Sequence, residues 1–281
     1  MQLHAPAKIN LSFRILNRRP DGFHEIETLM APVSLYDEIT LQPNESGIRF
    51  DCDDSALLND NLVVRAAELF FEKTKRKPAV AIELRKKIPH GAGLGGGSSD
   101  AATTLLGLNE LFQAGLSRAE LSGLAAQIGS DVPFFIYQSA AICCGRGEIV
   151  TPTKLKTPMS LLLLKPEFSV PTPSAYGRWQ NSRELPGISY AVQEFDGAQF
   201  VNDLERPVFE KFVFLAETKR WLQQQPEVGA ALMSGSGSTV FAVLKDGADV
   251  KKLAERARAE LDPNLWTYSC QTLEGAALSA P

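Results

Sequence analysis

The chain has 281 residues, of which 44% are hydrophobic and 22% are charged. This balance excludes a disordered chain and suits a folded protein of one large or two modest domains. The net charge is −4, with 29 Lys and Arg against 33 Asp and Glu, which argues against a nucleic-acid partner because such proteins usually carry a basic balance or stripe.

The first half of the chain mixes strand-like and helix-like patterns. Alternating polar and apolar residues bounded by turn residues predict strands over 8–16, 26–33, 38–42, 47–52 and 79–84. Helical spacing predicts a helix capped by Asn59 or Asp60 and stopped by Pro78, then a helix over 101–112. A capping box at Ser117 opens another helix, to about residue 128. A tight turn over 129–133 and a strand over 134–144 are expected next.

The second half continues the mixture after a linker with two prolines at residues 151–158. We therefore expect an N-terminal domain over 1–153 and a C-terminal domain over 154–281. The patterns predict strands over 161–164, 239–244 and 266–273, helices over 210–225 and 250–261, and a glycine-serine loop over 229–238. Strands and helices do not alternate strictly, so the fold class is α+β.

The cysteines and the N-terminus bear on the compartment. Cys143 and Cys144 are adjacent in an apolar stretch, without Cys-x-x-Cys spacing or a histidine cluster, so reduced thiols are expected. Residues 1–8 lack the apolar core of a signal peptide, and no stretch reaches the ~18 apolar residues of a membrane helix. We expect a cytoplasmic enzyme with no membrane partner.

Residues 91–97 include five glycines and lead into a predicted helix. Glycine lets a ligand approach the main chain, and a helix N-terminus offers unpaired N–H groups and partial positive charge. The strand–loop–helix order favours a phosphate site, with a merely tight or flexible loop as the alternative. No Gly-Lys-Ser/Thr follows, so this is not a Walker A loop, and no dinucleotide fingerprint is evident. Another cation must neutralise the transferred phosphate.

Three further segments are candidates for the same site. Lys8 and Asn10 lie on one strand face, which would line either a site or an exposed sheet surface. Asp131 places a carboxylate at a helix exit, where turn aspartates commonly bond their own backbone. The small residues of 233–239 could cover a ligand or simply turn the chain.

Taken in order, these segments resemble the GHMP kinases, the family of galactokinase, homoserine kinase and mevalonate kinase. The resemblance is carried by residues 6–11, 19–24, 60–62, 91–102, 129–135, 171–173 and 234–237. It implies a two-domain fold, with an N-terminal domain like the second domain of ribosomal protein S5 and a ferredoxin-like C-terminal domain. ATP and the acceptor would meet in the cleft between them, in a monomer or a weak homodimer.

The resemblance also implies the reaction and its residues. The γ-phosphate of ATP, with Mg²⁺ expected beside it, would pass to the 2-hydroxyl of a small molecule carrying a cytidine diphosphate group, in the non-mevalonate route to isoprenoid precursors. Asp131 resembles the general base and Lys8 its partner. The positions that match nucleotide contacts are Asn61, Lys86, Pro89, Gly91, Ala92, Gly93, Leu94, Gly95, Gly96, Gly97, Ser98 and Ser99.

The acceptor positions implied by the resemblance are Asn10, Phe23, His24, Thr172 and Tyr176. Phe23 and Tyr176 would stack on the cytosine, and His24 would bond its edge. The metal ligands stay unassigned, with an oxygen from Ser98 or Ser99 as a candidate. A non-catalytic module that binds RNA or a protein on the same scaffold is the alternative class, and ATP consumption by the purified protein would separate the two.

Overall fold

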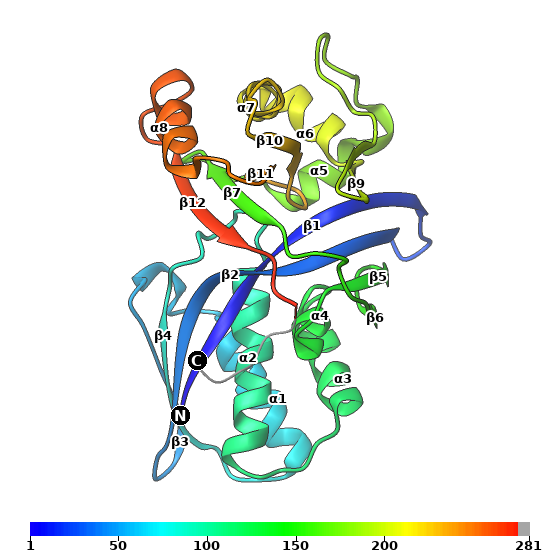
Figure 1. Ribbon diagram of the computed structural model, residues 1–281. Helices are drawn as coiled ribbons and strands as arrows, with labels where there is room; N and C mark the ends of the chain where they lie inside the picture. Colours follow the sequence, from blue (N-terminus) through cyan, green and yellow to red (C-terminus); the bar gives the residue numbers. More distant parts are fainter. Residues whose placement is uncertain (275–281) are drawn as a thin grey trace.

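The structure, a computed structural model, describes residues 1–274 and contains one sheet of eight strands and one of four (Figure 1). Two long antiparallel strands, β1 (Gln2–Arg18) and β2 (His24–Pro43), lie in the middle of the larger sheet. They run from the lower half of the molecule into the upper half (Figure 1). The break expected between residues 33 and 38 is absent, because residues 34–37 contain no glycine or proline and Leu35 keeps the buried alternation.

The remaining strands extend the larger sheet on both sides. Its order is β3-β4-β2-β1-β9-β8, with β5 pairing to β2 and β6 to β5. Their bounds are β3 (Gly47–Cys52), β4 (Ala79–Arg85), β5 (Ala141–Gly145), β6 (Ile149–Pro152), β8 (Gln193–Phe195) and β9 (Ala198–Asn202). Since β8 and β9 follow residue 153, this sheet contains strands from both sides of the predicted domain boundary. The division at 153/154 stays a prediction.

Helices of the first half pack on the larger sheet (Figure 1). They are the 3-10 helix η1 (Ser55–Leu57) and the α-helices α1 (Leu62–Thr74), α2 (Gly96–Leu111), α3 (Arg118–Ile128) and α4 (Val132–Tyr137). The cap of α1 is Asn61 rather than Asn59 or Asp60, because the Asn61 side chain accepts a hydrogen bond from the Val63 N–H. The capping box predicted at Ser117 is confirmed.

The second half forms a four-stranded antiparallel sheet of order β10-β11-β7-β12. The strands are β7 (Ser160–Lys165), β10 (Val228–Met233), β11 (Val240–Leu244) and β12 (Trp266–Gln271). The helices are α5 (Thr172–Arg178), η2 (Trp179–Asn181), α6 (Glu205–Lys211), α7 (Val213–Gln223) and α8 (Val250–Glu260). Helices between β7 and β10 and between β11 and β12 make this a ferredoxin-like βαββαβ arrangement, as predicted.

Three expected elements are corrected by the structure. Residues 132–137 form helix α4 rather than strand, since Pro133 suits a first helical turn and the apolar run is buried against other helices. The helix expected over 210–225 is two helices that meet at Phe212. Strand β10 occupies much of the expected loop over 229–238, since the run after Gly229 is apolar and buried, and Gly229 itself leaves room for the ring of Phe195. In residues 1–274, no helix is both long enough and apolar enough to span a bilayer.

Candidate active site

A cavity of about 900 Å³ lies where the two halves of the chain meet, and it is lined by residues from both. Every predicted site residue lines it except Ser99, which is fully buried in the first turn of α2. Because α2 begins at Gly96 and not at residue 101 as expected, Ser98 faces the cavity while Ser99 turns inward. The predicted site residues therefore lie around one cavity, with the Ser99 side chain buried behind its wall.

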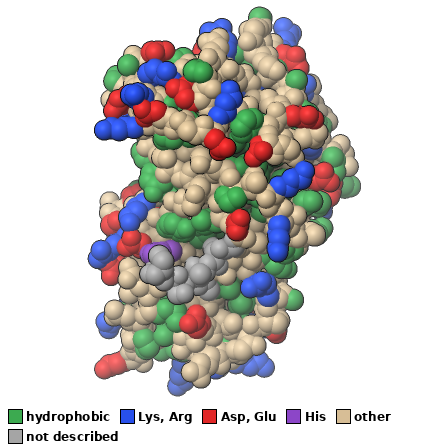
Figure 2. Space-filling view, viewed as in Figure 1, with side chains coloured by type: hydrophobic (Ala, Val, Ile, Leu, Met, Phe, Trp, Pro, Cys, Tyr) green, Lys and Arg blue, Asp and Glu red, His purple; other side chains and the backbone are tan. Residues whose placement is uncertain are grey.

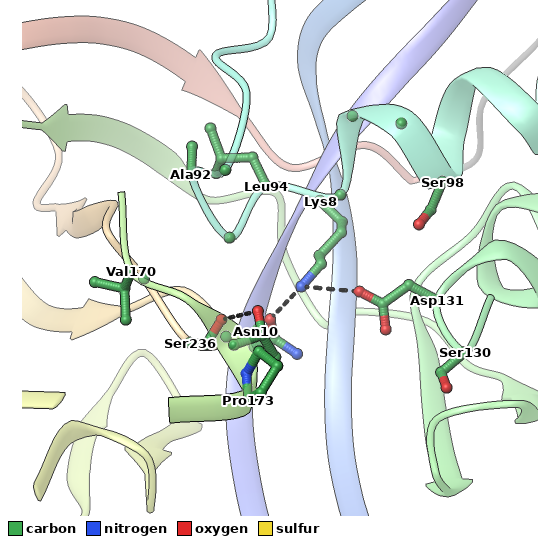
Figure 3. Close-up of a pocket in the computed structure, with 18 of the residues that line it drawn as sticks. Lys8, Asn10, Ala92, Leu94, Ser98, Ser130, Asp131, Val170, Pro173 and Ser236 are labelled. Carbon is green, nitrogen blue, oxygen red and sulfur yellow. Dashed lines mark hydrogen bonds and ion pairs between the residues drawn. The ribbon is translucent and has the colours of Figure 1, made fainter. Parts of the chain in front are cut away.

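Lys8 and Asp131 meet on one wall of this cavity (Figure 3). The Lys8 ammonium lies 3.5 Å from the Asp131 carboxylate, and the Lys8 side chain is 4% exposed against 39% for Asp131. Asp131 is the N-cap residue of α4, but its side chain makes no cap hydrogen bond. The carboxylate is thus not bonded to its own turn, and it opens to the cavity beside a buried cation.

Asn10 is held at both ends of its side-chain amide. Its Oδ1 accepts a hydrogen bond from Lys8 Nζ at 2.6 Å, and its Nδ2 donates to Thr28 Oγ1 at 2.9 Å. The Thr28 hydroxyl donates in turn to the Ser12 carbonyl at 2.6 Å. Sequence analysis placed Asn10 at the acceptor and did not find Thr28, since their contact depends on the register of β1 against β2.

The glycine-rich loop packs closely against Lys8 and against the second loop. Gly91, Gly93 and Gly95 have φ of +63°, +74° and +71°, values that favour glycine. An added Cβ at Gly93 would lie 2.2 Å from the Ser234 carbonyl oxygen, and one at Gly95 would lie 2.9 Å from Lys8 Cγ. The loop ends at the N-terminus of α2, whose first N–H groups have no partner within the helix.

The second loop, residues 234–239, covers part of the cavity. Ser234 Oγ donates to the Gly93 carbonyl at 2.9 Å, so the two loops are joined directly. The hydroxyls of Thr172 and Ser236 lie 2.8 Å apart, which links the start of α5 to the same loop. Of the two interpretations that the sequence left open, the structure supports a loop that covers a ligand cavity.

Lys86 lines the cavity, but its ammonium is committed to two buried carboxylates. Its Nζ donates to Asp37 and to Asp100, the latter at 2.7 Å. Burial raises the pKa of Asp100 to about 8, with Lys86 opposing this rise and Asp37 adding to it. Burial alone would lower the pKa of Lys86, but the two carboxylates raise it above its ordinary value. The cluster therefore ties β2 and the segment before the glycine loop to α2.

Aromatic side chains gather at the other end of the cavity. The rings of His24 and Tyr176 stack with centroids 5.2 Å apart, and Phe23 is half exposed under the guanidinium of Arg146. Burial lowers the pKa of His24, and the charge of Arg18 lowers it further. Burial raises the pKa of Tyr176, with the Asp131 charge adding to it. A neutral imidazole and a neutral phenol beside exposed rings suit a flat, polar-edged heterocycle.

Arg18 and Arg146 line this end of the cavity and were not found from the sequence. Arg146 stands between two glycines in a short turn, a pattern that gives no signal for a ligand contact by itself. Within residues 1–274, no group of three His, Cys, Asp or Glu side chains is placed to hold a metal ion.

Comparison with known proteins agrees with this geometry. Residues 61–139 match the family model of the GHMP kinases N terminal domain, and residues 191–262 match that of GHMP kinases C terminal. A 4-diphosphocytidyl-2-C-methyl-D-erythritol kinase of Methylacidiphilum infernorum is 42% identical over 276 residues, which cover 96% of each chain. This chain belongs to the GHMP kinase family.

Other GHMP kinases resemble the chain to different degrees. A 4-diphosphocytidyl-2-C-methyl-D-erythritol kinase of Geobacillus thermodenitrificans is 39% identical over 274 residues, covering 93% of this chain and 94% of the relative. The crystal structure of a 4-(cytidine 5'-diphospho)-2C-methyl-D-erythritol kinase is 36% identical, with a TM-score of 0.79 over 99% of this chain and 100% of that one.

A homoserine kinase from Cytophaga hutchinsonii has a TM-score of 0.71 at 18% identity, covers 98% of this chain and 95% of that one, and shares the fold alone. The predicted two-domain α+β GHMP kinase fold is confirmed. ATP is the nucleotide of this kinase family, and a small molecule is its substrate.

Proposed function

We propose that the chain transfers the γ-phosphate of ATP to the 2-hydroxyl of 4-diphosphocytidyl-2-C-methyl-D-erythritol, a step of the non-mevalonate route to isoprenoid precursors. The relatives that bear this name are 36–42% identical in sequence over nearly the whole of this chain, which supports the activity. The observation that carries the chemistry is the Asp131 carboxylate, which makes no capping hydrogen bond to α4 and lies beside Lys8. Both line a cavity that has aromatic side chains at one end and the glycine-rich loop at the other.

Asp131 acts as the general base in this proposal. A tertiary hydroxyl is a weak nucleophile, and a carboxylate within hydrogen-bond reach accepts its proton as the bond to phosphorus forms. Lys8 stabilises the ionised carboxylate before the reaction and the negative charge that develops on the phosphoryl oxygens during it. Asn10 and the main chain of Leu94 fix Lys8 in place, since the Lys8 N–H donates to the Leu94 carbonyl at 2.9 Å.

The glycine-rich loop binds the phosphates of ATP in this proposal. The cavity holds the start of α2, where Gly95, Gly96 and Gly97 expose main chain without side chains. Unpaired N–H groups and the helix dipole attract phosphate there. Asn61 and Pro89 line the same region of the cavity. Lys86 would support ATP binding indirectly, because its bond to Asp100 holds the segment before the glycine-rich loop against α2.

The residues present also fit Mg²⁺, which keeps several waters and needs only one or two protein oxygens beside substrate phosphates. The Ser98 hydroxyl lines the cavity at the start of α2 and would hold the ion, which supplies neutralisation of phosphate charge when bound. The burial of Ser99 within the helix favours Ser98 as the serine that would hold the ion.

We also propose that the protein is cytoplasmic and has no nucleic-acid partner. All four cysteines are free, which suits a reducing cytoplasm. Acidic and basic side chains are interspersed on the face seen in Figure 2, which supports a protein without a nucleic-acid partner. We keep the expectation of a monomer or a weak homodimer.

The test is a coupled assay of ATP consumption with four acceptors: the diphosphocytidyl alcohol, homoserine, mevalonate and galactose. Phosphorylation of the first at the highest kcat/KM is expected, and preference for any other acceptor contradicts the proposal. Asp131→Asn should lower kcat by about 10²- to 10⁴-fold while ATP still binds. Asp249→Asn is the matched control, because Asp249 caps α8 outside the cavity. Near-normal turnover of Asp131→Asn would remove the base assignment.

A further inference from the structure

Two arginines at the aromatic end of the cavity have no part in the mechanism above. Arg18 lies at the end of β1, and Arg146 lies on the turn between β5 and β6. Both line the cavity, and the Arg146 guanidinium carbon lies 4.8 Å from the centroid of the Phe23 ring.

The turn that carries Arg146 also lies close to Ser130 and Asp131. An added Cβ at Gly147 would lie 3.5 Å from the Ser130 carbonyl oxygen and 3.6 Å from Asp131 Oδ1. Arg146 is therefore next in the chain to a residue that lies close to Asp131, while its own guanidinium covers Phe23. Its charge lies on the Phe23 side of the cavity that Asp131 also lines.

These two guanidiniums keep free hydrogen-bond donors. In the part of the chain that the structure describes, the ion-pair partner of Arg146 is Glu148, whose carboxylate lies 3.6 Å from Arg146 Nε and accepts the Arg146 main-chain N–H at 2.6 Å. Arg18 has no ion pair within the same residues. Arg19, by contrast, is bonded to both Asp21 and Glu25. A guanidinium presents a rigid planar fork of donors that matches phosphate oxygens.

The chemistry of the proposed acceptor favours a cation at this place. In a molecule built as nucleobase, ribose, diphosphate and alcohol, the anionic group lies between the stacked base and the reacting hydroxyl. We propose that Arg146 binds the diphosphate of the acceptor and so makes the site specific for nucleoside diphosphate alcohols, with Arg18 adding positive charge. This inference rests on the proposed function, because it assumes a cytidine diphosphate acceptor.

The test compares the affinities of cytidine, CMP and CDP by titration calorimetry for the wild type, Arg146→Ala and Arg146→Lys. For Arg146→Ala we expect about a tenfold or greater loss of CDP affinity and less than about a twofold change for cytidine. Arg146→Lys keeps the charge without the fork and should lie between the two. With the full acceptor, KM should rise while kcat stays within about threefold. Arg256→Ala removes a similarly exposed, paired arginine outside the cavity and should change none of these values.

Equal losses for cytidine and CDP would overturn the inference, because Arg146 would then act by packing on Phe23. Unchanged CDP affinity in Arg146→Ala would overturn it as well. A wild-type protein that binds neither ligand would refute the proposed function itself. ATP affinity and thermal unfolding of each variant separate a loss of contact from a loss of fold.

Discussion

At the scale of single residues, the position of the Lys8 ammonium depends on a side chain that does not touch it. Three hydrogen bonds run from Lys8 through Asn10 and Thr28 to the Ser12 carbonyl. Asn10 and Thr28 are each 1% exposed, so loss of the threonine hydroxyl would remove the hydrogen-bond partner of a nearly buried Asn10 Nδ2. An unpaired amide would favour other orientations of Asn10 and release Lys8. Thr28 is thus a positioning residue.

Replacing Thr28 by valine, which has the same shape without the hydroxyl, should lower kcat by about tenfold with little change in the KM for ATP. Steady-state kinetics measure both values, and Thr28→Ser should restore most of the rate. Thr218→Val is the control, since Thr218 is equally buried and its hydroxyl donates to the Phe214 carbonyl in α7, outside the cavity. If both valine variants keep the wild-type kcat, Thr28 does not position Lys8 for catalysis and its role is structural only.

Asp100 makes stability depend on pH in a definite direction. Its pKa is raised from 3.8 to about 8 in the folded protein by burial. Between these two values the folded state holds a proton that the unfolded state has lost, so the free energy of unfolding falls as pH rises through this window. Asp100→Asn resembles the protonated form and should flatten that fall. Urea denaturation from pH 5 to pH 8.5 measures it, and identical slopes for the variant and the wild type would contradict the assignment.

Sequence analysis recognised residues through their chemistry but could not see which partners burial gives them. Lys8, Asp131 and the glycines lie in the predicted cavity because their segments fold together in this family. Lys86 was expected at the nucleotide, yet its ammonium is bonded to Asp37 and Asp100, which come from other parts of the chain. Only the fold reveals such a pairing.

At the scale of elements, the two glycine loops act as one unit. The Thr239 N–H donates to the Ala92 carbonyl at 3.1 Å, in addition to the bond from Ser234 to Gly93. The glycine-rich loop is therefore held in part by the loop from the second half of the chain.

Gly93→Ala should break this contact. Its φ of +74° strains an alanine, and the added Cβ would lie 2.2 Å from a main-chain oxygen. We expect a loss of about 2 kcal/mol or more in the free energy of unfolding, together with weaker ATP binding. Chemical denaturation and calorimetry measure the two effects.

Gly123→Ala is the matched control for this variant. Gly123 lies in α3 with nothing within 4 Å of an added Cβ, so alanine should stabilise the helix by about 0.5–1 kcal/mol. Wild-type stability and ATP affinity in Gly93→Ala would show that the loops move apart freely.

The errors in the predicted elements have more than one cause. Residues 132–137 form a short apolar run that neither helical nor strand periodicity can assign. In β1, by contrast, polar and apolar residues alternate along the sequence, and the strand was predicted correctly in its central part although residues 5–11 are buried on both faces. The glycines of α2 concealed the start of that helix, because glycine is a poor helix former and suggested loop.

At the scale of the whole molecule, the buried side chains of residues 1–274 form three clusters, and two of these join the two halves. One cluster draws its buried members from residues 3–143 alone. Another combines Phe13, Ile15 and Ile26 with residues of the second half, and the third combines β1 and the glycine loop with β7 and β11. A half released from the other would expose the side chains of the shared clusters. We therefore expect the parts on either side of residue 153 to unfold together.

Leu108→Ala tests whether the chain unfolds as one unit. Leu108 is fully buried on α2 in the cluster confined to the first half, and its truncation should cost about 2–5 kcal/mol. All three tryptophans, at 179, 221 and 266, lie in the second half and report on that half by fluorescence. If the shared clusters couple the halves, tryptophan fluorescence and far-UV circular dichroism should show one coincident urea transition, moved to lower urea by the substitution.

Leu222→Ala serves as the positive control, since Leu222 is buried in the second half and should lower the fluorescence midpoint in either case. Two independent halves would give a different result for Leu108→Ala. The fluorescence midpoint would keep its wild-type value while circular dichroism gained an early step. ATP provides a second comparison, because it contacts mainly the first half in the proposed site. In a coupled chain, ATP should raise the tryptophan-detected midpoint as its binding free energy requires.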